Sequence, residues 1–447
     1  MRATSSLIVK RALLPLALVV ATALVVVATI RDARQTAAVK AAPAAPPSSP
    51  VSGTSRGELT RTVEQMTARI AERPTDGAAV ILLADALIRL QRVNNDGRAV
   101  ITAEEHLRAF LKANPDHYDA QRMLAAVLLS QHRFADAIKQ ANKVNALDPR
   151  DAWNYGAIGD GYFELGDYER AFAAYDRMGQ LQPGPPAYAR TAHALEIKGD
   201  LAGALEYMKR AADGSWSNDP ESQAWHYAQL GDLLLQQGRV GDARREYEHA
   251  AATFPNHPLA MAGLAKVKIA DGDLDGARLT YQEQLARVPT PDLAIAVGDL
   301  LEATGDATGA EQYYRMAEQI ERAAWGNGPA QPQALARFLA EHDRSLPEAL
   351  TLAEEAVVSR RDIYTMDTLA WSYFKAGRLA DANKATVQAQ RTGSLDARIL
   401  YHAAEIQAAM GKAPVARDTL ARIPAPDAIA DVRLARAVKA LKTRLSS

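Results

Sequence analysis

Four glycines beside aspartates are the first residues whose types and spacing could serve chemistry. Gly156, Gly159, Gly161 and Gly166 lie in YGAIGDGYFELGDYERA, residues 155–171. A glycine-rich turn can cradle phosphate if it follows a strand and has the spacing G-x-G-x-x-G or G-x-x-x-x-G-K-[ST]. This cluster has neither spacing, and no strand is predicted before it. It therefore does not predict a phosphate-binding loop.

Carboxylates and histidines are the second group with possible chemistry. Asp160, Asp232 and Asp299 recur at one position of a repeat, but each is expected on a different helix pair, roughly 10 Å or more from the next. Charge that faces solvent or a partner is the better interpretation. His402 and Glu405 lie one helical turn apart and could form half a metal site, although a packed histidine beside a solvated glutamate is favoured.

Motifs of the main enzyme classes are missing from the sequence. There is no H-E-x-x-H, no G-x-S-x-G, no kinase or nucleotide motif and no cysteine. The 447 residues include 52 basic and 53 acidic side chains, a net charge of −1, which does not resemble the basic footprint of a nucleic-acid binder. The sequence therefore predicts no enzyme, no cofactor, no metal, no small-molecule substrate and no nucleic acid.

An alanine that recurs along the chain reveals the elements that carry these residues. Its spacings are 34, 34, 33, 39, 34, 33, 39, 33 and 34 residues. These marker alanines are Ala103, Ala137, Ala171, Ala204, Ala243, Ala277, Ala310, Ala349, Ala382 and Ala416. Glycine stands five residues earlier, at Gly166, Gly199, Gly238, Gly272, Gly305, Gly377 and Gly411.

Three further positions keep the same step. A small residue stands twelve before the marker, at Ala125, Gly159, Ala192, Gly231, Ala265, Gly298, Ala370 and Ala404. Proline stands twelve after it, at Pro115, Pro149, Pro183, Pro255 and Pro289. Tyrosine stands four after it, at Tyr175, Tyr247, Tyr281 and Tyr314.

This pattern predicts helix hairpins. The first helix ends at the glycine, which adopts the left-handed conformation at little cost, and the second helix stops before the proline. The two small residues meet where the helices cross. One hairpin cannot bury its apolar face alone, but stacked hairpins can. Gly159 is thus interpreted as a close-packing position and Gly166 as a helix cap.

These residues resemble the tetratricopeptide repeat, a 34-residue helix-turn-helix unit. The match is best in residues 154–183 and covers roughly Leu59 to Arg444. The resemblance implies an all-α fold, a right-handed superhelical solenoid of about 9–10 antiparallel helix hairpins. Three repeats depart from the pattern: RVNNDGRAVI is inserted before Ala103, the glycine before Ala349 is missing, and the last repeat is degenerate.

The resemblance also implies where a partner binds. In this family the first helices line the concave face, which could hold an extended peptide or a partner helix with basic and apolar side chains. The alternative is that several of the aromatic residues only pack between repeats. The candidate partner-binding residues are Trp153, Asp160, Phe163, His193, Trp225, Asp232, Lys266, Asp299, Trp371, Phe374 and Tyr401.

The N-terminal region predicts a membrane anchor. Residues 12–30 are uncharged and would span about 28 Å as a helix, close to a bilayer's hydrocarbon core. Basic residues in the cytoplasmic n-region, 1–11, favour an inner-membrane protein with its repeats on the periplasmic side. A cleaved signal peptide is the alternative. An Ala/Pro/Ser-rich linker, 31–58, and the solenoid, 59–445, complete the predicted domains.

The longer spacings suggest an internal duplication. The series 34, 33, 39 occurs twice, and both 39-residue intervals contain tryptophan. We hypothesise a duplicated block of three repeats, which requires like conformations for residues 211–223 and 322–333. Two independent loop insertions are the alternative.

The predicted function is a non-catalytic, membrane-tethered scaffold that binds other proteins or peptides in a bacterial cell envelope. Three alternatives remain open. They are a periplasmic chaperone-like receptor for an unfolded envelope or cytochrome substrate, an enzyme hidden in a solenoid, and a soluble secreted protein if the N-terminus is cleaved.

Overall fold

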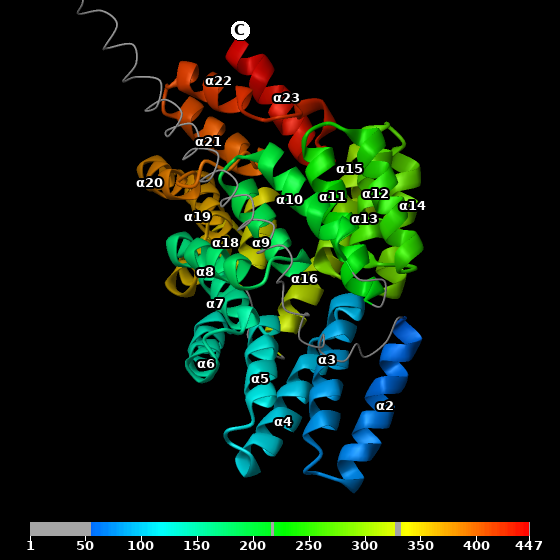
Figure 1. Ribbon diagram of the computed structural model, residues 1–447. Coiled ribbons are helices and arrows are strands. Elements are labelled where there is room, and N and C mark those ends of the chain that lie inside the picture. Colours follow the sequence, from blue (N-terminus) through cyan, green and yellow to red (C-terminus); the bar gives the residue numbers. More distant parts are fainter. Residues whose placement is uncertain (1–54, 216–218, 327–331, 447) are drawn as a thin grey trace, which may run out of the picture. The chain divides into compact units, whose positions relative to one another are not determined.

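A computed structural model describes residues 55–215, 219–326 and 332–446, and this part of the chain contains helices and no strands. All the helices belong to one compact unit, Val51–Ser447 (Figure 1). They are α2 (Arg56–Glu72), α3 (Gly77–Asn94), α4 (Gly97–Ala113), α5 (Tyr118–Ser130), α6 (Phe134–Leu147), α7 (Ala152–Leu165), α8 (Tyr168–Leu181), α9 (Pro185–Ile197), α10 (Leu201–Asp213), α11 (Pro220–Gln236), α12 (Val240–Thr253), α13 (Pro258–Ala270), α14 (Leu274–Arg287), α15 (Pro291–Ala303), α16 (Ala307–Gly326), α17 (Pro332–Glu341), α18 (Leu346–Ser359), α19 (Ile363–Lys375), α20 (Leu379–Ala389), α21 (Ala397–Ala409), α22 (Ala413–Ala421), the 3-10 turn η1 (Pro426–Ala428) and α23 (Val432–Ser446).

Successive helices pack as hairpins, from α3 with α4 to α21 with α22. Every second helix of these ten hairpins carries one marker alanine, and each marker is at most 2% exposed. A side chain this small lets the two helix backbones approach closely. The predicted all-α repeat architecture is confirmed for the described residues.

The helices end at the predicted glycines and before the predicted prolines. All seven glycines five residues before a marker have φ between 74° and 93°, the left-handed conformation that ends a helix. Helices α4, α6, α8, α12 and α14 each end two residues before the predicted proline. Asp167, Asp200 and Asp273 then cap the following helices by accepting hydrogen bonds from backbone amides.

The irregular hairpins reach the same turn with other residues. Asn95 ends α3 with φ of 52°, and His132 takes φ of 57° five residues before Ala137. Asp343 and Ser345, with φ of 54° and 36°, replace the missing glycine before Ala349. A left-handed residue is therefore a requirement of the hairpin geometry, which glycine meets at the lowest cost.

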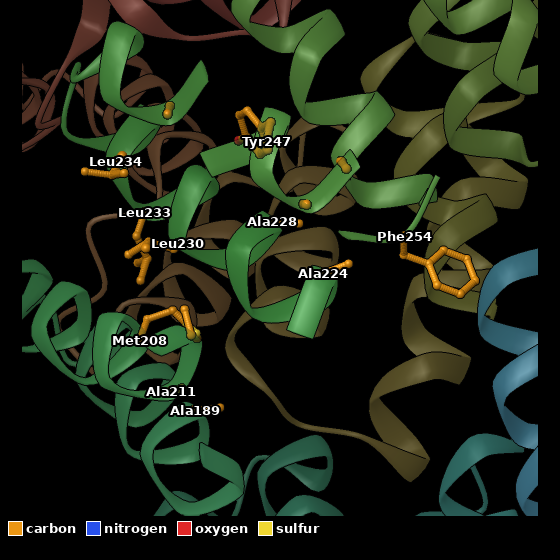
Figure 2. Close-up of a cluster of buried hydrophobic side chains, with 14 of the residues drawn as sticks. Ala189, Met208, Ala211, Ala224, Ala228, Leu230, Leu233, Leu234, Tyr247 and Phe254 are labelled. Carbon is orange, nitrogen blue, oxygen red and sulfur yellow. The ribbon is translucent and has the colours of Figure 1, made fainter. Parts of the chain in front are cut away.

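The largest cluster of buried side chains lies around α9 to α13 (Figure 2). Leu230, Leu233 and Leu234 of α11 and Met208 of α10 contribute to it. Phe254, which ends α12, also packs in this cluster, together with residues of α3. This core therefore joins hairpins that are distant in sequence as well as neighbours.

Contacts between distant repeats add to those between neighbours. The amide of Ile363 donates to the hydroxyl of Tyr168 at 2.9 Å, and the amide of Arg361 donates to the carbonyl of Leu165 at 3.2 Å. Arg89 on α3 similarly forms an ion pair of 2.6 Å with Asp219, beside α11. The sequence pattern predicted none of these contacts.

The two long intervals have unlike conformations. Helix α10 ends at Asp213, nine residues after its marker, whereas α16 continues to Gly326, sixteen residues after its marker. The extra length in the first interval extends the first helix α11, and in the second interval it extends the second helix α16. The duplication hypothesis loses the support that like conformations would have given it.

The membrane prediction requires correction. No helix in residues 55–215, 219–326 and 332–446 is long and apolar enough to span a bilayer. Localisation as a single-pass inner-membrane protein is therefore not supported, and we do not retain it. The predicted anchor, residues 12–30, lies outside the described residues.

Candidate interaction groove

Five first helices line a cavity of about 920 Å³. They are α13, α15, α17, α19 and α21, and residues of the second helix α14 and of the C-terminal segment, 430–437, also line it. Its apolar lining comes mainly from aliphatic and aromatic side chains, including Leu259, Ile269, Tyr281, Leu293 and Phe338. The volume lies in the range of cavities that enclose a substantial ligand surface.

Several charged groups that line this groove are paired with one another. Arg337 contacts Asp292 at 3.0 Å, and Lys375 contacts Asp343 at 2.6 Å. Both carboxylates lie at the rim, since the side chains of Asp292 and Asp343 are 81% and 55% exposed. Rim pairs of this kind contribute little to stability and can exchange partners.

Two further ion pairs connect α17 and α21 with the residues that precede α23. Arg398 of α21 contacts Glu341 of α17 at 2.9 Å and Asp431 at 2.9 Å. Glu341 and Asp431 raise the pKa of the Arg398 guanidinium against the opposing effect of burial. This arginine therefore stays charged and connects two first helices with the C-terminal segment.

The recurring aspartates serve an internal function at the hairpin joints. Tyr175, Tyr247 and Tyr314 each donate a hydrogen bond to the aspartate fifteen residues earlier, at 3.1, 2.9 and 2.8 Å respectively. A cationic or imidazole side chain of a following hairpin contacts the same carboxylates: Arg190 with Asp160 at 2.6 Å, Lys266 with Asp232 at 2.6 Å and His342 with Asp299 at 2.9 Å. Each aspartate thus links the two helices of its own hairpin to a later one.

The same tyrosines explain why glycine stands at three of the small-residue positions. A Cβ on Gly159 would lie 2.4 Å from the Tyr175 ring, one on Gly231 would lie 2.6 Å from Tyr247, and one on Gly298 would lie 2.5 Å from Tyr314. The rings therefore lie against the glycine backbone, where no side chain fits. This confirms the close-packing interpretation of Gly159.

Trp371 lines the cavity but is largely buried among other rings, with 6% of its surface exposed. Its ring stacks on His402 at 4.0 Å between centroids with an interplanar angle of 12°, and on Phe374 at 4.9 Å. His402 Nδ1 lies 2.9 Å from the Asp367 carboxylate. Glu405 instead pairs with Arg444. His402 is thus a packed histidine, and the described residues contain no group of three or more potential metal ligands.

The predicted partner-binding residues are divided between the groove and other places. Four of the eleven line the cavity, namely Lys266, Asp299, Trp371 and Tyr401. The others lie outside it. Arg122 lies 4.6 Å from the centroid of the Trp153 ring, and Phe163 packs on Tyr168. Trp225 packs on the large buried cluster around α9 to α13. Also outside are Asp160, His193, Asp232 and Phe374.

Sequence reasoning missed several lining residues. Arg337, Glu341 and His342 belong to the hairpin without a cap glycine, where the expected register is lost. Arg398 stands outside the position expected to face a partner, and Arg433 follows the last recognisable repeat. Only the regular first-helix position carried a signal that could have located such residues.

Comparison with known proteins identifies the repeats. Two family profiles, both described as tetratricopeptide repeat, match the chain. One matches residues 234–300, and the other matches residues 102–152 and 368–429. Cellulose synthase 1 operon protein C of Komagataeibacter xylinus is 27% identical over 45% of this chain and 15% of its own length. Tetratricopeptide repeat protein 36 of Homo sapiens is 38% identical over 20% of this chain and 47% of its own. The chain thus spans less than half the length of these curated relatives.

Solved structures that match the chain have low sequence identity to it. The crystal structure of the APC/C hetero-tetramer Cut9-Hcn1 is 16% identical, with a TM-score of 0.44, over 88% of this chain and 60% of that one.

Proposed function

Because the chain is a tetratricopeptide-repeat protein, we propose that it is a non-catalytic scaffold that binds other proteins, holding a peptide or partner helix in the groove. The supporting observation is the cavity of about 920 Å³ that five successive first helices line. Its walls combine apolar side chains with rim ion pairs. A ligand can bury apolar surface there while its charged groups take the place of one partner in an exposed pair.

The recurring aspartates in and beside the groove are already paired, which limits how a partner can be recognised there. Asp232 and Asp299 each hold a tyrosine and a group of a later hairpin, so a partner that took these carboxylates would disrupt a hairpin joint. Rim residues such as Arg337 and Lys375 can be engaged without that cost. We therefore assign recognition of charge to the rim and recognition of shape to the apolar floor.

A charge-reversal variant tests this function. Arg337→Glu with Lys375→Glu changes two rim charges whose partners are largely exposed, so the fold should persist. The matched control is Lys139→Glu with Lys143→Glu, two exposed residues of the second helix α6. Purified full-length proteins serve as bait in extracts of the source cells, and a captured protein is then purified and titrated directly.

Each outcome has a defined meaning. We expect a binding partner of the wild type and of the α6 control to lose affinity about tenfold or more for the groove variant. Equal affinity for all three proteins would place the binding surface elsewhere and overturn the proposal. Circular dichroism and the melting temperature establish that the variants remain folded.

A further inference from the structure

The segment Pro424–Ala437 lies across the first helices that line the groove. Ala425 is 3.1 Å from the position that a Cβ on Gly238 would take, at the turn between α11 and α12. Ala430 packs against the large buried cluster around α9 to α13, and Val432 packs against the cluster formed by α13 to α16. The segment thus covers groove surface that would otherwise be open to a ligand.

Two arginines hold this segment to α15 and α17. Arg433 donates to the Glu302 carboxylate at 2.7 Å and to the carbonyl of Glu341 at 3.1 Å. Arg436 donates to the carbonyl of Ala303 at 2.6 Å, at the C-terminus of α15. A helix C-terminus carries partial negative charge, so this end of the groove is suited to guanidinium groups.

The segment 424–437 and the part of α23 that follows it are attached differently. Val438 and Leu441 are buried against α21 and α22, and they fix the second half of α23 as the end of the solenoid. Residues 424–437 are held by Arg433 and Arg436, which remain partly or fully exposed, by the ion pair of Asp431 with Arg398, and by partly buried apolar side chains. They begin with a stretch whose only regular structure is η1. Contacts of this kind break at lower cost than a buried apolar interface.

We propose that residues 424–437, which form part of the groove wall, are an internal competitor for the first-helix surface beneath them, and that the partner which displaces them is an arginine-bearing amphipathic helix preceded by extended chain. This rests on the proposed function of the groove and specifies its ligand. The partner's arginines take the Glu302 carboxylate and the carbonyl end of α15, while its apolar face replaces Val432. The segment shows which side chains this surface binds, because its own arginines and Val432 already make these contacts within the chain.

A labelled peptide with the sequence of residues 424–446 tests the competition. An internal competitor lowers apparent affinity by the fraction of time that the site is closed, so opening the site raises that affinity. Full-length Arg433→Ala with Arg436→Ala should bind the peptide about tenfold more tightly than the wild type by fluorescence anisotropy. The matched control, Lys439→Ala with Lys442→Ala, changes two exposed residues of the same helix and should bind as the wild type does.

The peptide's own arginines provide the test of specificity. A peptide with the residues that correspond to Arg433 and Arg436 replaced by glutamate should lose binding to the opened variant. Equal affinity of the wild type, the arginine variant and the lysine control would overturn the competition. Equal binding of the two peptides would overturn the proposed arginine recognition.

A thiol reporter gives a second measurement that leaves both arginines in place. The chain has no cysteine, so Val432→Cys introduces a single reactive group on the face of the segment that packs against the cluster of α13 to α16. Its modification should be slow and should accelerate about tenfold when excess peptide holds the segment open, whereas exposed Lys439→Cys should react rapidly throughout. A reporter that stays protected while the peptide binds would overturn displacement but leave the proposed function standing. Only equal partner binding by the rim variant Arg337→Glu/Lys375→Glu contradicts that function.

Discussion

The hydroxyl of Tyr247 donates a hydrogen bond of 2.9 Å to Asp232, fifteen residues earlier on the opposite helix of the hairpin. Burial and the neighbouring carboxylate raise the pKa of Tyr247 well above its ordinary value, so the phenol remains a donor. Lys266 of the next hairpin contacts the same carboxylate oxygen at 2.6 Å. One carboxylate therefore orders two helices and the hairpin that follows them.

We predict that Tyr247→Phe lowers the free energy of unfolding by about 1 kcal/mol, because the substitution removes the hydrogen bond and keeps the ring. Tyr281→Phe is the matched control. It changes the equivalent tyrosine of the next hairpin, where Lys266 stands in place of the aspartate. Urea denaturation followed by circular dichroism measures both. Equal losses in the two variants would show that the carboxylate link is unimportant.

Glycine-to-alanine substitutions in one hairpin should have opposite signs. Gly159→Ala places a Cβ 2.4 Å from the buried Tyr175 ring and should destabilise by about 1–3 kcal/mol. Gly179→Ala, in α8, has no heavy atom within 4 Å of the new Cβ and should stabilise by about 0.5–1 kcal/mol through helix propensity. Thermal melts measure the melting temperatures of the two variants and of the wild type. Changes of melting temperature in the same direction would contradict the packing explanation.

The contact between Tyr168 and Ile363 should be visible in hydrogen exchange. Tyr168→Phe removes the acceptor for the Ile363 amide, a partner 195 residues distant, so that amide should exchange about tenfold faster. The amides of Tyr364 and Thr365, which donate to Asp362, are internal controls. Unchanged protection at Ile363 would show that the contact is not formed in solution.

Two buried histidines should each lower the stability of the fold as the pH is lowered below about 6.5. Burial lowers the pKa of His226 and of His257 to about 4 in the folded chain, whereas an unfolded histidine titrates near 6.5. Between these values the unfolded state binds more protons, so acidification favours unfolding by about 1 kcal/mol per histidine from pH 7.5 to 5.5. Glu321, whose pKa burial raises to about 7, acts in the opposite sense.

A single substitution isolates the histidine effect from that of Glu321. His257→Gln should reduce the slope of unfolding free energy against pH in this window, because one proton uptake on unfolding is lost. His249→Gln, which changes an exposed histidine, should leave the slope unchanged. Urea titrations at several pH values measure the slopes, and identical slopes for wild type and His257→Gln would contradict the assignment.

Sequence alone determined the hairpins and their boundaries. Marker alanines, left-handed glycines and terminating prolines act within a few residues of the structure that they specify, so their pattern can be read along the chain. Gly166 and Pro183 bound their helices as predicted. Part of the groove was also accessible in this way, since Lys266, Asp299, Trp371 and Tyr401 line the cavity.

Tertiary structure decided how those side chains are used. Trp371 and Asp299 stand at the same repeat position, yet one packs on His402 and the other links Tyr314 to His342. Whether a first-helix residue faces a ligand or a neighbouring helix depends on the register of the next hairpin. Contacts such as Arg433 with Glu302 join residues 131 apart and leave no periodic trace, because they arise only when the stacked hairpins bring distant surfaces together.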